Sequence, residues 1–123
     1  LHDALPIYTF VTEKGINFDL KKLLDSYPNN KIILTNANEE ELVTFGIVNM
    51  PYPVFSLAHN PNKTDSDYFV KMLQHFNLKT EEVVYFEHNP DAVASAKSIG
   101  ITTFHYNKLE NLDNLTIFLN SNL

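Results

Sequence analysis

Residues 83–102 read VVYFEHNPDAVASAKSIGIT, which combines a strand, a polar turn and a helix in immediate succession. Val83-Val84-Tyr85-Phe86 is a continuous apolar run, as is typical of a strand buried on both faces of a parallel sheet. Asn89-Pro90 supplies an N-cap followed by proline at the first helical position, and Gly100 ends the predicted helix. The polar turn Glu87-His88-Asn89 therefore follows the carboxyl end of a buried strand, where open α/β proteins place their ligand sites.

The same alternation of short apolar runs and amphipathic stretches extends through the 123 residues. Strands are predicted at 7–11, 32–35, 54–57, 83–86 and 101–104. Helices are predicted between them, at about 20–27, 39–46, 68–76, 90–99 and 112–119. Strands that alternate with helices predict βαβ units, and so a three-layer, Rossmann-like α/β domain with a mostly parallel sheet.

Composition narrows the function classes. The formal charge of −6 and the lack of a basic run disfavour binding to nucleic acid. The absence of cysteine excludes thiol catalysis and thiolate metal sites. No apolar run approaches the roughly 20 residues that a membrane span needs, and no signal peptide is visible at the N-terminus. We therefore expect a cytoplasmic protein that does not bind membranes.

Three predicted strand ends carry polar residues, in sequence order. Thr35-Asn36 follows the second strand, Lys63 lies just before a helix, and Glu87, His88 and Asp91 follow the fourth strand. Because the carboxyl ends of parallel strands meet at one edge of a sheet, these side chains are expected to face one pocket. Thr35 and Lys63 are suited to phosphoryl oxygens, and the acids are suited to Mg²⁺, which prefers oxygen ligands.

In this order three segments resemble the second, third and fourth motifs of the haloacid dehalogenase (HAD) superfamily: KIILTNANEEEL (31–42), NPNKTDSDYFVKML (60–73) and residues 83–102. The resemblance implies a Mg²⁺-dependent phosphohydrolase that acts through a phosphoaspartate on a phosphorylated small molecule or macromolecule. It implies that Lys63 is catalytic through charge neutralisation, and that Thr35 and Asn36 contact the phosphoryl group. It also implies that Glu87, with His88 or Asp91, faces the metal.

The first motif of that family, Asp-x-Asp-x-Thr, departs from its pattern here. When Thr9 is aligned with the final Thr, Leu5 and Ile7 occupy the positions of the nucleophile and the general acid–base, so the chain as given is expected to be inactive. Residues 3–7, DALPI, match the translation of a common sequencing adapter. We therefore predict a non-native segment at 1–7 and a HAD-like domain at 8–123. Residues 1–6 are expected to be irregular, with the first strand starting near Ile7.

The fourth motif admits two alignments. In one, Glu87 and His88 take the positions of paired acids; in the other, shifted by one residue, Glu87 pairs with Asp91. His88 is a poor ligand for Mg²⁺ because imidazole prefers softer cations. Structural alternatives stay open: Thr35 as an ordinary strand end, Lys63 as a surface lysine, and the acids as favourable charges at a helix N-terminus.

Spacing also bears on function. The intervals from Thr9 to Thr35 and from Thr35 to Lys63 are too short for an inserted cap domain, so a capless member is expected. A non-catalytic phosphate-binding or scaffolding domain on the same fold is the alternative to an enzyme. A receiver-like signalling domain is disfavoured because the run 54–57 offers no phosphoacceptor Asp. His59, His75 and His105 show no ligand spacing and are expected to be structural or surface residues.

Overall fold

A five-stranded parallel sheet forms the centre of the molecule. The computed structural model of the chain describes residues 2–6, 11–12, 15–44, 49–107 and 112–123. The strands have the order β5-β4-β1-β6-β7, and each neighbouring pair is parallel. They are β1 (His2–Pro6), β4 (Asn30–Thr35), β5 (Val54–Ser56), β6 (Val83–Glu87) and β7 (Thr102–His105). A separate antiparallel hairpin pairs β2 (Val11–Thr12) with β3 (Gly15–Ile16).

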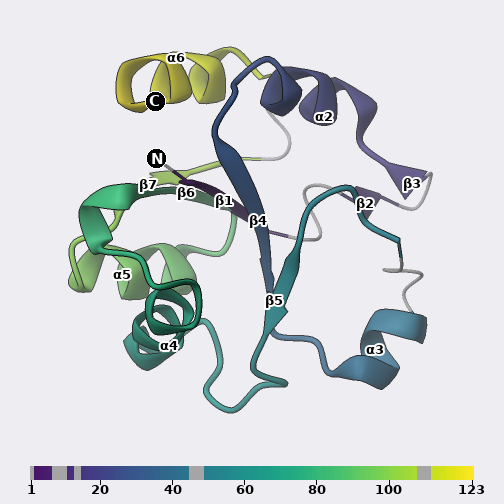
Figure 1. The fold of residues 1–123 in the computed structure, drawn as a ribbon, viewed down its shortest axis with the longest axis vertical. Coiled ribbons are helices and arrows are strands. Elements are labelled where there is room, and N and C mark those ends of the chain that lie inside the picture. The colour runs from purple at the N-terminus through teal and green to yellow at the C-terminus, as the bar shows by residue number, and fades with distance from the viewer. Residues whose placement is uncertain (1, 7–10, 13–14, 45–48, 108–111) are drawn as a thin grey trace.

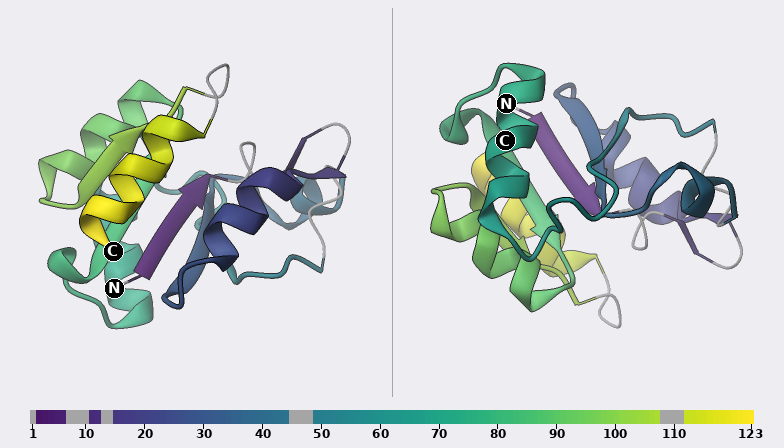
Figure 2. Two further views of the ribbon diagram at one scale, coloured as in Figure 1. Left: turned by 90° about the horizontal axis from the view of Figure 1, so that it is seen from above. Right: turned by 90° about the horizontal axis from the view of Figure 1, so that it is seen from below.

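Helices cover both faces of this sheet. Figure 1 shows α2 (Phe18–Asp25) and α6 (Asp113–Asn122) on one side, and α4 (Ser66–Phe76) and α5 (Pro90–Ser98) on the other. Seen from above, α2 and α6 lie on the near side with β1 visible between them (Figure 2). The short α3 (Glu39–Thr44) follows β4, and one 3₁₀ turn (Thr80–Glu82) precedes β6. The predicted three-layer α/β architecture is thereby confirmed.

Two apolar clusters hold the layers together, because successive residues of a strand point to opposite faces. On the side of α4 and α5, the buried residues include Ile32, Leu34, Phe69, Met72 and Tyr85. On the side of α2 and α6, they include Leu20, Leu24, Ile33, Phe86 and Leu115. Both faces of β4 and β6 are therefore buried, as their continuous apolar runs predict.

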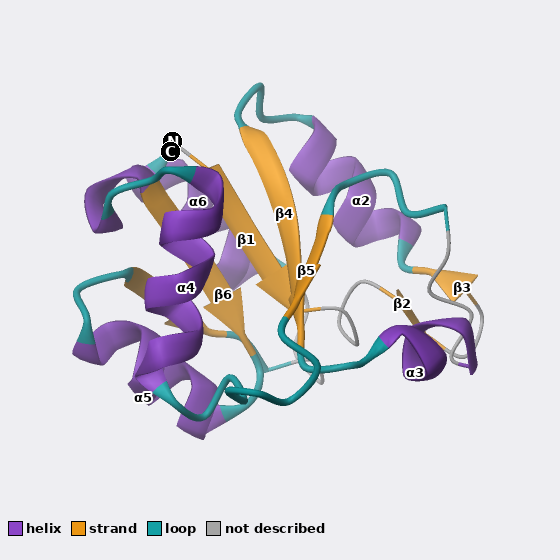
Figure 3. Cartoon of the chain, turned by 60° about the horizontal axis from the view of Figure 1, so that its bottom comes forward, coloured by secondary structure: helices purple, strands orange, loops and turns teal. Residues whose placement is uncertain are grey.

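Tyr68 fixes α4 against the carboxyl ends of two strands. Its ring is fully buried, and its hydroxyl donates to the carbonyl oxygen of Thr35 at 2.9 Å and lies 3.1 Å from that of Phe55. Asp65 caps the helix by accepting from the N–H of Asp67. The loop before α4, which carries Lys63, is consequently held at the same edge of the sheet as the end of β4 (Figure 3).

The expectation of an irregular N-terminal segment was wrong for residues 2–6, and Leu1 lies outside the described residues. His2–Pro6 form the central strand, paired with β4 along their whole length and with β6 from His2 to Ala4. Pro6 is the last residue of the strand, paired with Leu34 and beyond the pairs with β6, and at a strand end a missing N–H disturbs the ladder least. Of the strand predicted at 7–11, residues 7–10 lie outside the described residues, and Val11 belongs to β2. The non-native origin of residues 1–7 stays a prediction.

The remaining strands and helices match their predicted positions to within a few residues. Gly100 adopts a φ of 95°, the left-handed conformation expected just after a helix. Between Thr35 and Lys63 the described residues form α3, β5 and their loops. None of the helices in the described part of the chain is long and apolar enough to cross a membrane.

Leu24 provides a test of the core on the side of α2 and α6. Its side chain is fully buried, so Leu24→Ala should lower the free energy of unfolding by about 2–5 kcal/mol, from lost burial and the cavity left behind. Ile117, 63% exposed on α6, is the matched control; Ile117→Ala should change that free energy by less than about 0.5 kcal/mol. Urea titrations followed by circular dichroism measure both, and equal losses would contradict this packing.

Candidate functional site

A pocket of about 280 Å³ opens at the carboxyl ends of β4 and β6. Five of the six residues predicted for the site line it: Thr35, Asn36, Lys63, Glu87 and His88. The remaining lining residues are Ala37, Glu41, His59 and Asn89. The predicted convergence of polar strand ends on one edge is therefore confirmed, whereas the roles of the individual residues stay predictions.

A buried ion pair lies at the centre of this pocket. The Nζ of Lys63 is 2.7 Å from Oε1 of Glu87, and it also donates to the carbonyl oxygen of Leu34 at 3.3 Å. The side chain of Glu87 is fully buried and that of Lys63 is 10% exposed. Lys63 is thus no surface lysine: its ammonium connects the loop before α4 to the ends of β4 and β6.

The carboxylate of Glu87 accepts hydrogen bonds on both oxygens. Oε1 accepts from Lys63 and from the hydroxyl of Tyr85 on the same strand. Oε2 accepts from the backbone N–H of His88 at 2.9 Å and from that of Asn89 at 3.1 Å. The carboxylate is therefore fixed in one orientation by Lys63 from the loop before α4, by Tyr85 from β6 and by two N–H groups of its own turn.

These contacts keep Glu87 ionised. Burial raises the pKa of the Glu87 carboxyl, but the charge and hydrogen bond of Lys63, with the bonds from Tyr85 and the Asn89 N–H, more than offset this, and the pKa lies below its usual value. Burial and the nearby Glu87 charge raise the pKa of Tyr85 well above its usual value. Tyr85 consequently stays protonated and acts as a donor.

A pair of asparagines positions the backbone of Lys63. The carboxamide oxygen of Asn36 accepts from the N–H of Lys63 at 2.7 Å, and its Nδ2 donates to Oδ1 of Asn62 at 3.0 Å. Asn62 Oδ1 also accepts from the N–H of Thr64 at 3.2 Å. Asn36 was predicted to contact substrate; here it joins the end of β4 to the Lys63 loop.

His59 forms the rim of the pocket, which the sequence did not predict. Its Nε2 is 2.9 Å from Oε1 of Glu41, and its Nδ1 is 3.4 Å from Nδ2 of Asn62. An amide nitrogen only donates, so Nδ1 accepts and Nε2–H donates to the carboxylate. Bonds from the Asn38 N–H and from His59 hold the pKa of Glu41 below its usual value. His59 thereby connects α3 to the loop that carries Lys63.

Comparison with known proteins rests on structure. No protein-family model matches the sequence, and no curated protein is significantly similar to it. An uncharacterized protein from Corynebacterium glutamicum ATCC 13032 superposes with a TM-score of 0.66 at 16% identity, covering 98% of this chain and 92% of that one. The HAD family enzyme bt-2542 from Bacteroides thetaiotaomicron, in complex with magnesium and inorganic phosphate, superposes with a TM-score of 0.66 at 15% identity. A HAD-superfamily hydrolase of subfamily IA from Geobacter sulfurreducens gives 0.55 at 17%.

The chain has the HAD-like fold. The Bacteroides enzyme matches 82% of this chain and the Geobacter hydrolase 72%. The chain spans 57% of the length of the first enzyme and 45% of that of the second. The resemblance found in the sequence motifs is therefore confirmed at the level of the fold.

The residues of this pocket do not suit Mg²⁺. The lone pairs of Glu87 are taken by four donors, and Glu41 is bonded to Asn38 and His59. His88 lies with Nδ1 at 3.3 Å from Glu87, and imidazole is a softer ligand than Mg²⁺ prefers. In the described part of the chain, no group of three or more His, Cys, Asp or Glu is placed to hold a metal ion.

Asp91 does not join the pocket. It is exposed in the first turn of α5, where its N–H donates to the side chain of the N-cap Asn89. A carboxylate in that turn complements the positive end of the helix dipole. Of the two alignments of the fourth motif, the one that pairs Glu87 with His88 is thus the one whose two residues line the pocket.

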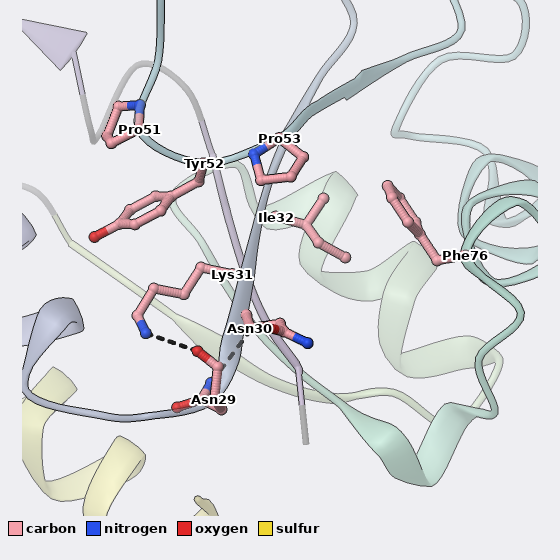
Figure 4. A pocket seen from close by; sticks show the side chains of 8 residues that line it. All are labelled: Asn29, Asn30, Lys31, Ile32, Pro51, Tyr52, Pro53 and Phe76. Carbon is pink, nitrogen blue, oxygen red and sulfur yellow. Dashed lines mark hydrogen bonds between the residues drawn. The ribbon is translucent and has the colours of Figure 1, made fainter.

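A second pocket, of about 410 Å³, lies at the opposite end of β4 (Figure 4). The rings of Tyr52, Pro53 and Phe76 line it together with Lys31. The ammonium of Lys31 donates to the carbonyl oxygens of Tyr27 and Asn29, each at 2.8 Å. None of the six predicted site residues lines this pocket.

Replacement of Glu87 tests the buried pair. Glu87→Gln leaves the Lys63 ammonium buried without its counter-charge, so the free energy of unfolding should fall by about 3–5 kcal/mol at neutral pH. Because the folded-state pKa is lowered, this stabilisation is complete above the usual value of 4.5 and is lost as the pH falls through the folded pKa. The difference between the variant and the unmodified chain should therefore shrink in acid.

Urea titrations across this pH range measure the effect. Asp67→Asn is the matched control, because Asp67 forms an exposed pair with Lys71 at 3.9 Å; its effect should stay below about 1 kcal/mol. A loss from Glu87→Gln as small as that of the control would contradict the buried pair.

The rim loop contains two consecutive non-glycine residues in the left-handed conformation, Ala58 (φ 52°) and His59 (φ 66°). This conformation costs alanine about 1–2 kcal/mol, and glycine adopts it without strain at some cost in entropy. Ala58→Gly should therefore raise the free energy of unfolding, by up to about 1 kcal/mol. Ala94→Gly, at an exposed position in α5, should lower it by about 1 kcal/mol. If urea titrations show that both variants are destabilised equally, the rim geometry is wrong.

Proposed function

We propose that this chain is an oxyanion-binding domain with the HAD-like fold that does not hydrolyse phosphate esters in its present sequence. One observation carries the proposal. Thr35 and Lys63 converge beside Glu87 at the carboxyl edge, while the central strand brings no carboxylate to that edge. The donors that hold an oxyanion are therefore present, and the group that would attack phosphorus is missing.

The register of the sheet supports the proposal that no carboxylate takes the place of the nucleophile. Pro6 pairs with Leu34, the residue before Thr35, and Ala4 pairs with Tyr85, two residues before Glu87. The only acid of β1, Asp3, pairs with Val84, three residues before Glu87. At about 3.3 Å per residue it is displaced by about 10 Å along the strand from the pocket. Asp3 therefore cannot replace the acid missing at Leu5.

The class of ligand can be inferred from the hydrogen-bond donors of the pocket. The Thr35 hydroxyl oxygen accepts from the N–H of Ala37 at 3.2 Å, so its own hydrogen can be donated to an anion. An ammonium has three donors, and Lys63 directs one to Leu34 and one to Glu87. A phosphate group, on a small molecule or on a macromolecule, matches one hydroxyl and one ammonium. The inorganic phosphate held by the Bacteroides enzyme of the same fold supports this ligand class.

The second candidate is a Mg²⁺-dependent phosphohydrolase whose two acids are replaced in this chain. It is favoured by the fold and by the magnesium in the Bacteroides enzyme. In the alignment of the first motif, acids at positions 5 and 7 would supply hard oxygen ligands of the kind that Mg²⁺ prefers. The two candidates differ in whether the variant Leu5→Asp/Ile7→Asp gains phosphatase activity.

Phosphatase activity separates the two candidates. We expect no hydrolysis of an aryl phosphate above background by the unmodified chain with Mg²⁺, because it has no nucleophile. The variant Leu5→Asp/Ile7→Asp should recover little or no turnover, because Glu87 is already bonded to Lys63. Leu5→Asn/Ile7→Asn is the control for folding without the new charges. Turnover by the Asp variant that disappears on Glu87→Ala would support the enzyme and contradict the binding domain.

Phosphate binding is tested directly on the unmodified chain. Inorganic phosphate should shift the backbone amide NMR signals of Asn36, Lys63 and Ala37 in a saturable manner. Thr35→Val removes one donor and should weaken the interaction by about 1–3 kcal/mol. Lys71→Met, a change at an exposed lysine on α4, should leave it unchanged. Amide signals that stay fixed up to high phosphate concentration would refute the proposed function.

A further inference from the structure

We propose that the Lys63–Glu87 pair makes this pocket an oxyanion site that works without a metal ion. In this arrangement the ammonium of Lys63 occupies the side of Glu87 that a divalent cation would need, and it supplies the positive charge for the anion. The inference rests on the proposed function for its ligand. Beyond that function, it states that Lys63, and not a metal ion, balances the negative charges of Glu87 and of the bound anion.

The carboxylate of Glu87 is saturated with hydrogen-bond donors. A carboxylate offers about four lone-pair positions, and Glu87 uses them for Lys63, Tyr85 and the N–H groups of His88 and Asn89. Its side chain has no exposed surface. A metal ion could coordinate Glu87 only by displacing one of these donors, and a displaced buried donor would lose its partner.

The ammonium also acts on the site electrostatically. Lys63 lies 2.7 Å from Oε1 of Glu87, and both side chains are shielded from water. Charges interact more strongly where water is excluded. A divalent cation on Glu87 would therefore be repelled by Lys63, whereas an anion would be attracted where it lies nearer to the ammonium than to the carboxylate.

Other hard oxygen ligands, which Mg²⁺ prefers, are scarce among the described residues of the pocket. Four backbone carbonyl oxygens at this edge already accept hydrogen bonds. Those of Leu34 and Thr35 accept from Lys63 and Tyr68, that of Ala37 from the Ser56 hydroxyl, and that of Glu87 from the Tyr106 N–H. Glu41, the other acid of the pocket, is bonded at Oε1 to the Asn38 N–H and to His59. The described part of the pocket thus offers donors to an anion and few acceptors to a cation.

The unmodified chain provides the first test. Inorganic phosphate is titrated into the chain with EDTA and again with Mg²⁺, and binding is followed by the amide NMR signals of the pocket. We expect saturable shifts in EDTA and a dissociation constant that Mg²⁺ changes by less than about twofold. Binding seen only with Mg²⁺ would overturn the inference and leave the proposed function standing. Binding in neither buffer would overturn the proposed function.

A metal titration without phosphate tests the inference separately. Mn²⁺, a paramagnetic ion with similar oxygen ligands, should leave the amide signals of His88 and Asn89 sharp, because Glu87 does not coordinate it. Strong broadening of these two signals at low Mn²⁺ concentration would overturn the inference, whatever the phosphate titration gives.

Removal of the ammonium should create a metal site. Lys63→Met frees one oxygen of Glu87 and removes the repulsion, so Mg²⁺ should raise the thermal midpoint of this variant by mass action. The midpoints of the unmodified chain and of Lys71→Met, the exposed-lysine control, should not respond. A folded Lys63→Met variant that gains no stability from Mg²⁺ or Mn²⁺ would overturn the role given to Lys63. If that variant does not fold, the two titrations of the unmodified chain decide the inference.

Discussion

The ion pair between Lys63 and Glu87 is the interaction on which the organisation of the carboxyl edge depends. It joins the loop before α4 to the end of β6, and through the Leu34 carbonyl it reaches β4. A buried pair costs desolvation energy that its attraction repays only when the remaining hydrogen-bonding positions are satisfied. Tyr85 and two backbone N–H groups meet that requirement at Glu87. The pair consequently specifies one geometry for the pocket.

The HAD-like fold and the chemistry of this chain are separate matters, because one fold supports different chemistries when the residues at its edge differ. Here the sheet has the order β5-β4-β1-β6-β7 with helices on both faces, and the described central strand ends in Leu5 and Pro6 at the carboxyl edge. What remains is a lysine, a hydroxyl and a fixed carboxylate. In the proposed function this set binds an anion while the carboxylate stays paired with the lysine.

Much of the fold could be predicted from local patterns. The strand at 83–86 and the helix after Asn89-Pro90 carry several agreeing signals, namely a continuous apolar run, a cap and a proline at the first turn. The order of the strands could not be predicted, because it depends on contacts between distant residues. The central strand was misplaced because DALPI matches an adapter translation and contains a proline, so residues 1–6 were expected to pair poorly; the pairing of His2–Pro6 with β4 and β6 contradicts that expectation.

The site was predicted less completely than the fold. Thr35, Lys63 and Glu87 were found because strand ends of a parallel sheet converge on one edge. His59 was missed because its place at the rim depends on left-handed residues and a bond to α3, neither of which has a periodic pattern; its position four residues before Lys63 was the available signal. Asp91 was overestimated because an acid in the first turn of a helix serves the helix equally well without facing the pocket.

A crystal structure of the chain grown with both phosphate and Mg²⁺ would show directly whether Lys63 or a metal ion balances the charge of Glu87. We expect a phosphate ion within hydrogen-bonding distance of Lys63 and Thr35, with Lys63 still bonded to Glu87 and no metal on that carboxylate. A magnesium ion coordinated by Glu87, with the Lys63 ammonium displaced, would contradict this expectation.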